Sequence, residues 1–121
     1  MWDCPLVQVE IHHDGKLIGR GNLAPGDPPM GVANGPFDPC PGYERDVHAG
    51  EIEGVHNPVG ADLSYVVKST EHGTVGCQGV FIQDYMDGLG ERHVSIIGIG
   101  YPEYETYFGG HPWFEAYRGK G

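Results

Sequence analysis

Metal-ligating side chains are densest at His12-His13-Asp14. On a β-strand, His12 and His13 would point to opposite faces, so they would not bind one ion unless a turn bent the chain. His48 and His56 are separated by a Gly- and Glu-rich stretch that matches no metal-binding template, and the HExxH motif is absent. The sequence therefore predicts no metal site, and it indicates no cofactor.

A catalytic nucleophile needs a positioned base, and the sequence shows no recognisable arrangement of this kind. No serine lies in a GxSxG elbow. Cys4, Cys40 and Cys77 are odd in number and widely spaced without a CxxC pair, so they indicate neither a disulfide framework nor a zinc ribbon. Cys77 follows His72 closely, which allows a Cys–His pair without requiring one. We expect reduced thiols, some packed as small hydrophobic residues.

Acid–base chemistry needs a carboxylate or imidazole in a partly apolar cleft. Asp84 is a candidate, because it lies at the end of an apolar stretch between Gln83 and Tyr85. The alternative is that Asp84 forms a turn at the end of a strand. Asp27, which precedes two prolines, has the same two interpretations. A small enzyme would combine Asp84 with His93 or His72.

Aromatic side chains offer a binding surface instead of a catalytic one. More than half of the aromatic residues lie between positions 101 and 117. Tyrosine and tryptophan combine a large apolar body with a polar tip, and they often line ligand sites and interfaces. We expect Tyr104, Phe108 and Trp113 in the core, and leave the other tyrosines of this region open between core and surface. The ligand or interface candidates are Asp27, Met30, Phe37, Tyr43, Asp84, Tyr101, Tyr107 and Tyr117.

The clearest element is a β-hairpin. Residues 6–12 alternate between apolar and polar side chains, which is typical of a half-buried strand. Asp14-Gly15 is a preferred pair for a tight turn, and residues 16–23 form the return strand. The glycines of this second strand weaken it or mark a bulge.

Residues 26–44 are nearly half Gly and Pro. A linker would be polar and featureless, whereas this segment carries apolar anchors such as Met30, Phe37 and Tyr43. A hairpin alone is not a stable domain, so the segment has nothing to link. We interpret it as an ordered loop that crosses the fold, with a short strand at 30–37 as an option.

The second half of the chain supplies the remaining elements. Residues 61–69 alternate, and residues 74–85 contain a short apolar strand core. Residues 93–100 are apolar at nearly every position, which predicts a central strand buried on both faces. Residues 101–110 have Pro near the start, Glu in the first turn and Gly-Gly at the end, which predicts a short helix. A second helical turn is expected at 111–119.

The charge balance restricts the partners. The chain has 121 residues and a net charge of −10 at pH 7, from 17 acidic and 7 basic side chains. This balance argues against binding to nucleic acid or to an anionic membrane surface. There is no long apolar run, and the first residues lack the features of a signal peptide. We expect a cytoplasmic protein with one domain over residues 1–121.

The segment DPPMGVANGPF at 27–37, with Tyr43 after it, resembles a pattern in small bacterial hypothetical proteins. Some of these are carried on mobile, integron-type gene cassettes. Residues 98–108 match a GxxYPxYExxF segment of the same proteins, and residues 79–85 and 89–100 are also similar. The resemblance spans most of the chain. It implies a bacterial single-domain protein and supplies neither an activity nor catalytic residues.

Taken together, these features predict an α+β fold that is mainly β. We expect an antiparallel sheet of about five strands, with a short aromatic C-terminal helix packed on it. Our first functional hypothesis is a non-enzymatic binding module for a small molecule or protein that self-associates as a homodimer. The alternative is a small acid–base enzyme with its cleft beside residues 26–44.

Overall fold

A single sheet contains every strand of the part of the chain that the computed structural model describes, namely residues 7–27, 30–69, 73–100 and 103–108. The strands are β1 (Val7–His13), β2 (Lys16–Asp27), β3 (Val32–Pro39), β4 (Glu51–Ile52), β5 (Val55–His56), β6 (Val66–Ser69), β7 (Gly73–Val75), β8 (Gly79–Tyr85) and β9 (Glu91–Ile97). The short helices are α1 (Arg45–His48), α2 (Pro58–Ala61), α3 (Met86–Leu89) and α4 (Glu103–Phe108).

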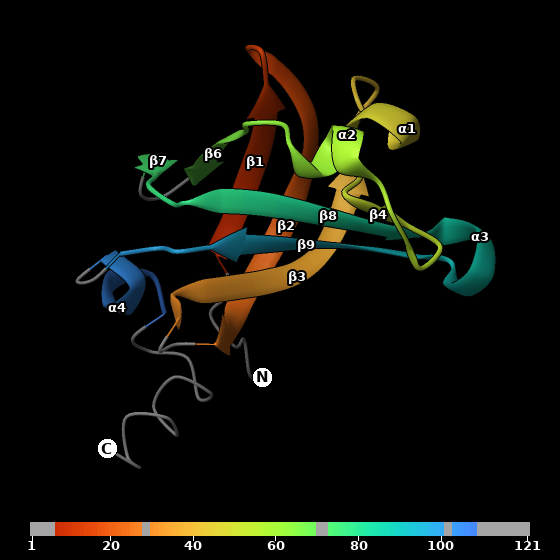
Figure 1. Ribbon diagram of the computed structural model, residues 1–121. Coiled ribbons are helices and arrows are strands. Elements are labelled where there is room, and N and C mark those ends of the chain that lie inside the picture. Colours follow the sequence, from red (N-terminus) through yellow and green to blue (C-terminus); the bar gives the residue numbers. More distant parts are fainter. Residues whose placement is uncertain (1–6, 28–29, 70–72, 101–102, 109–121) are drawn as a thin grey trace, which may run out of the picture.

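The sheet has nine strands in the order β5-β4-β8-β9-β3-β2-β1-β6-β7 (Figure 1). Its neighbours are antiparallel except for β4 and β8, which pair in parallel. The prediction of a mainly β fold with a mostly antiparallel sheet is confirmed, but the expected number of about five strands is wrong. The additional strands are β3, the two-residue strands β4 and β5, and β7, which is separate from β8.

The predicted first hairpin is confirmed. β1 pairs with β2, and the turn residues Asp14 and Gly15 have φ angles of 52° and 76°, as a tight turn with two left-handed residues requires. The pairing passes from Ile11↔Gly19 to His12↔Leu17. The residue between Gly19 and Leu17 is therefore an extra one, so β2 contains a bulge beside the glycine.

The Pro/Gly-rich segment is mostly strand and not loop. β2 extends to Asp27, and β3 lies between β2 and β9 in the interior of the sheet. Gly35 permits this position, because a Cβ there would lie 1.8 Å from the backbone oxygen of Asn22 in β2. The described residues of this segment outside the strands are the short stretches 30–31 and 40–44, and β3 is held by strand ladders on both sides.

β9 is an interior strand, as predicted, with β8 on one side and β3 on the other. The expectation that it is buried on both faces is wrong. Val94 and Ile96 are buried, whereas Ile97 is 40% exposed. The reason is that, within the described residues, the hydrophobic core lies on the inner face of the sheet, so outward side chains of interior strands still meet solvent.

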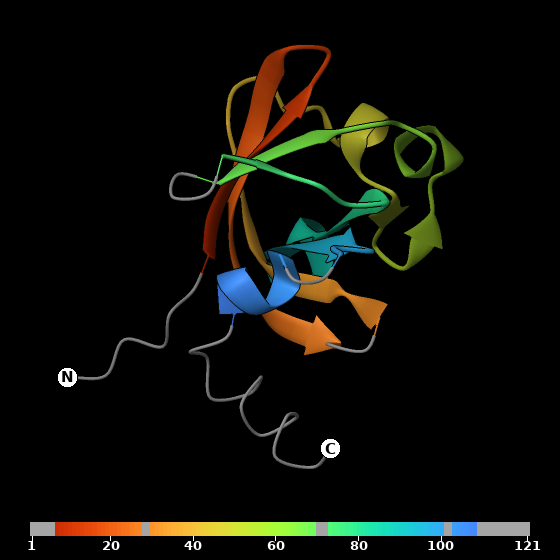
Figure 2. The ribbon, with the colours of Figure 1, turned by 90° about the vertical axis from the view of Figure 1, so that its left-hand side faces the viewer.

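The sheet curls around one hydrophobic core (Figure 2). Residues 63–65, which precede β6, face residues 77–80 at the start of β8 across a cavity of about 210 Å³. The buried hydrophobic side chains of the strands come mainly from β1, β2, β3, β8 and β9. The terminal strands of the described sheet, β5 and β7, do not pair with each other, so the curled sheet is open.

The predicted aromatic helix is present as α4, which lies at one end of the curl beside β3 and β9 (Figure 1). Tyr104 and Phe108 are buried, and the hydroxyl of Tyr104 donates a hydrogen bond of 2.8 Å to the backbone oxygen of Val32. Trp113 and the second predicted turn lie outside the described residues. Among the described helices, none has the length and apolar character needed to cross a membrane.

Candidate functional site

A hollow in the described part of the molecule forms where two paired strands separate. β3 pairs with β9 from Ala33 to Pro36, but its pairing with β2 continues to Pro39. Beyond Pro36, β3 therefore turns away from β9, and the two strands diverge (Figure 1). The space between them, which we call the β3–β9 groove, has a volume of about 500 Å³.

The β3–β9 groove has polar walls and an apolar lining beneath them. Arg20 of β2 lies directly opposite Asp38 of β3 in the strand ladder. The polar residues around the groove are Gln8, Arg20, Asn22, Asp38, Glu91, Arg92 and His93. The apolar ones are Pro36, Phe37, Pro39 and Met86. The groove thus offers both positive and negative groups to a ligand.

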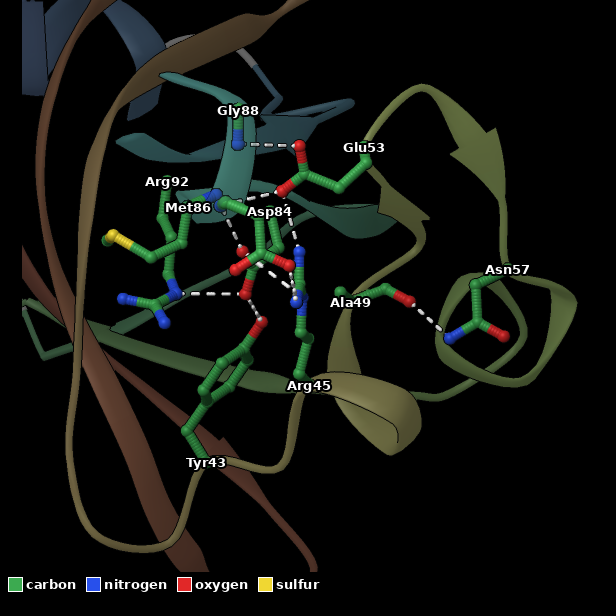
Figure 3. A network of polar contacts seen from close by, with 10 residues as sticks. Tyr43, Arg45, Ala49, Glu53, Asn57, Asp84, Met86, Gly88 and Arg92 are labelled. Carbon is green, nitrogen blue, oxygen red and sulfur yellow. Dashed lines mark hydrogen bonds and ion pairs between the residues drawn. The ribbon is translucent and has the colours of Figure 1, made fainter. Parts of the chain in front are cut away.

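Asp84 lies behind the groove at the centre of a hydrogen-bond network (Figure 3). Its carboxylate has no solvent exposure. Oδ2 accepts hydrogen bonds from the Tyr43 hydroxyl at 2.7 Å and from Nε of Arg92 at 2.8 Å. Oδ1 accepts the backbone N–H of Met86 at 3.1 Å. A second guanidinium approaches Oδ1, with Nε of Arg45 at 3.4 Å.

These contacts fix the charge of the network. Burial alone would raise the pKa of Asp84, but the hydrogen bonds from Tyr43, Arg92 and the Met86 N–H outweigh it and hold the pKa below its ordinary value of 3.8. The pKa of Tyr43 is raised by burial and by its hydrogen bond to Asp84. Asp84 is therefore an anion, and Tyr43 is a neutral hydrogen-bond donor.

Arg45 connects the network to α3. Its terminal nitrogens bind Glu53 at 2.6 Å and Asp87 at 2.8 Å. The carboxylate of Glu53 also accepts the backbone N–H groups of Asp87 and Gly88, at 2.8 Å and 2.9 Å. The β4–β5 turn is thereby tied to the first turn of α3 (Figure 3). This tie holds the β8–β9 connection, which forms one side of the groove.

Arg92 belongs to both the network and the groove. Its Nε binds Asp84, while its terminal nitrogens point away from that carboxylate (Figure 3). The guanidinium also lies 5.5 Å from the centre of the Tyr43 ring, as in a cation–π contact. Since the same side chain lines the groove, the buried carboxylate sets the position of a cation in the groove wall.

A second cluster surrounds His48, the last residue of α1. Its Nδ1 accepts the backbone N–H of Glu44 at 2.9 Å. Its ring lies 5.2 Å from that of His13 and 5.9 Å from that of Tyr43, measured between centroids. Burial and the neighbouring His13 lower the pKa of His48. Among the described residues, no group of His, Cys, Asp and Glu is arranged to hold a metal ion.

The sequence candidates fall into different places. Asp84 and Tyr43 are bonded to each other, and Phe37 is a core residue that packs against Tyr43 with ring centroids 5.3 Å apart. Met30 is 65% exposed and takes no part in the network. Tyr107 is half-buried beside Phe108 in α4, away from the groove.

The side chains of three candidate residues, Asp27, Tyr101 and Tyr117, lie outside the described part of the structure. Asp27 ends β2 opposite Val32, and only its backbone is described. Tyr101 and Tyr117 lie outside the described residues. The two cysteines within the described residues, Cys40 and Cys77, are free thiols, and Nη1 of Arg20 donates to the Cys40 sulfur at 3.2 Å.

Of the residues proposed for an acid–base enzyme, the two that the structure describes, Asp84 and His93, do not converge. Asp84 pairs with Arg92 across β8 and β9, and the next pair along the ladder is Gln83 with His93. Since neighbours on a strand point to opposite faces, Asp84 points into the network and His93 points outward into the groove. His72 lies outside the described residues.

Arg45, Arg92 and Glu53 are site residues that sequence reasoning missed. One signal was available: 7 basic side chains share the chain with 17 acidic ones. In such a chain each arginine has several carboxylates to pair with, so an arginine near a strand end points to an ion network.

Comparison with protein-family models, with curated proteins and with solved structures shows no significant match to this chain.

Proposed function

We propose that the protein is a non-enzymatic binding module whose ligand occupies the β3–β9 groove. The observation that carries the proposal is the groove itself, which is open where two interior strands diverge. Its volume of about 500 Å³ lies within the range typical of small-molecule sites. The wall behind it is held by the Asp84 network, so the groove is preorganised and loses little entropy on binding.

The ligand class follows from the lining. Asp38 and Glu91 suit a cationic group, and the guanidinium groups of Arg20 and Arg92 suit an anionic one. Phe37 and Met86 supply apolar contact. A small polar molecule that carries charges of both signs therefore fits this groove better than an extended polyanion.

The alternative enzyme hypothesis has less support. Both oxygens of Asp84 already accept hydrogen bonds from protein groups, and its low pKa keeps it ionised. His93 remains in the groove, where its Nε2 lies 3.2 Å from the Glu91 carboxylate. The side chains of this imidazole–carboxylate pair are 45% and 57% exposed, whereas acid–base chemistry requires a setting shielded from solvent.

The test is ligand-observed NMR with a library of small zwitterionic molecules, followed by mapping of hits on amide spectra. Asn22 is exposed on the groove wall, so Asn22→Trp fills the groove without entering the core. Thr74→Trp places the same ring on exposed β7 and serves as the matched control. We expect hits that shift amides of β3 and β9, with binding lost in Asn22→Trp and retained in Thr74→Trp. The proposal would be refuted if the molecules that bind the unmodified protein also bind Asn22→Trp, or if no molecule of the library binds.

A further inference from the structure

We propose that His48 is a pH-sensitive latch, which keeps the single turn of α1 closed when its ring is neutral and opens it when the ring is protonated. α1 runs from Arg45 to His48, and no side chain of its N-cap residue Glu44 caps it. Backbone hydrogen bonds donated by Val47, His48 and Ala49 close the turn, and the ring of His48 adds a further contact. The backbone N–H of His48 donates to the Glu44 oxygen at 2.8 Å, and the Glu44 N–H donates to Nδ1 of His48 at 2.9 Å.

The second contact determines where protons can go. Nδ1 must offer a lone pair to the Glu44 N–H, so the proton of the neutral ring is on Nε2. A further proton has only Nδ1 to bind. Protonated His48 would then turn an N–H toward the N–H of Glu44, and the hydrogen bond would be replaced by repulsion between two donors.

The surroundings of His48 keep the ring neutral at pH 7. His13, at the end of β1, lies 5.2 Å away, and Lys16 at the start of β2 adds a positive field. The uncharged rings of Tyr43 and Tyr65 lie 5.9 Å and 6.4 Å away. The carboxylate of Glu44 is the opposing charge. Burial, followed by His13, lowers the pKa of His48 in spite of Glu44.

The sign of the pH dependence follows from this. A histidine whose pKa is lower in the folded state stabilises the fold fully above its unfolded value of 6.5. As the pH falls below 6.5, that contribution decreases until the folded pKa is reached. α1 also carries Arg45, which holds Glu53 and Asp87, so opening the turn releases the tie to α3. The latch does not depend on any ligand in the groove.

The experiment measures, in one sample, the protonation of the His48 ring and the hydrogen bond that the Glu44 N–H donates to it. ¹⁵N spectra of the imidazole report protonation of His48, and amide hydrogen exchange reports protection of the Glu44 N–H as the pH is lowered. We expect protection of Glu44, corrected for the intrinsic pH dependence of exchange, to fall about tenfold per pH unit once His48 begins to titrate. The amide of Val94, in the buried interior of β9, should stay protected.

Two variants sharpen the result. His48→Asn keeps an acceptor near the position of Nδ1 but cannot titrate, so Glu44 should stay protected at low pH. His56→Asn removes an exposed histidine of β5 and should behave as the unmodified protein does. The latch is overturned if His48 takes up a proton while Glu44 stays protected, if His48→Asn loses protection in parallel, or if Val94 loses protection at the same pH. If His48→Asn does not fold, the ring and amide measurements on the unmodified protein decide alone.

Discussion

Asp84 illustrates what burial does to a single carboxylate. A charge without solvent exposure is costly unless protein groups replace its hydration. Here Tyr43, Arg92 and the Met86 N–H supply that replacement. The contact to Met86, two residues on, is the one that a turn-forming aspartate makes. The residue therefore joins a local turn to a long-range network.

The first prediction concerns this network. Asp84→Asn should lower the free energy of unfolding by about 3 kcal/mol, because it removes the charge that Arg45 and Arg92 share. Asp87→Asn is the matched control, since Asp87 pairs with Arg45 but its side chain is 73% exposed. Its loss should be much smaller. Urea denaturation measures both, and equal losses would contradict the central position of Asp84.

The second prediction concerns alkaline pH. Burial raises the pKa of Tyr65 to about 12, and burial also raises the pKa of Tyr43. An acid whose pKa is higher in the folded state contributes its full stability below the unfolded value of 10.0 and loses it as the pH rises further. The temperature of thermal unfolding should fall between pH 9 and 12, and it should fall less steeply in Tyr65→Phe. A variant as alkali-sensitive as the unmodified protein would refute it.

At the scale of elements, the prolines of β3 explain the groove. Proline has no N–H to give to a ladder, so it is tolerated where pairing ends. Pro36 is the last β3 residue that pairs with β9, and Pro39 is the last residue of β3. The two prolines thus mark the places where the strand leaves one neighbour and then ends.

The same prolines limited prediction from the sequence. The hairpin, the interior position of β9 and the helix α4 followed from local patterns, because alternation and capping are local signals. β3 was predicted only as the option of a short strand at 30–37, because dense Gly and Pro indicate a loop unless long-range pairing overrides them. Asp84 and Tyr43 were both recognised as candidates, but their contact joins residues 41 positions apart. Arg45, Arg92 and Glu53 complete a network that only the folded chain brings together.

The third prediction tests the close contact of β2 and β3. Gly35→Ala places a Cβ against the backbone oxygen of Asn22, 1.8 Å away without movement, so the strands must shift. We expect a loss of about 1–3 kcal/mol, as for other overpacked sites. Gly79→Ala in β8 is the control, because no atom lies within 4 Å of its added Cβ. Urea denaturation should separate the two, and equal stability would show that β2 and β3 are not closely packed.

At the scale of the whole molecule, we expect self-association through the β5 edge of the sheet. β5 is the terminal strand, and its Val55 is 68% exposed, with Val59 of α2 at 55%. Light scattering should give twice the chain mass of 13.1 kDa. Val55→Lys should shift the mass to that of one chain, because charge on an edge strand blocks pairing. Val66→Lys, on β6, is the control, and a monomeric unmodified protein would end this hypothesis.

The Asp84 network also has a consequence for the rates of folding and unfolding. The hairpin of β1 and β2 brings near neighbours in sequence together, whereas the network joins positions separated by 41 and 42 residues. Contacts that close long loops form after local ones, so the Tyr43–Asp84 and Arg45–Asp87 contacts form late on the way to the native state, after the local contacts of Asp84 with Met86 and Arg92. Interactions absent from the transition state slow unfolding and leave the folding rate almost unchanged. The long-range contacts of Tyr43 and Arg45 therefore govern how long the native state lasts, and have little influence on how fast it is reached.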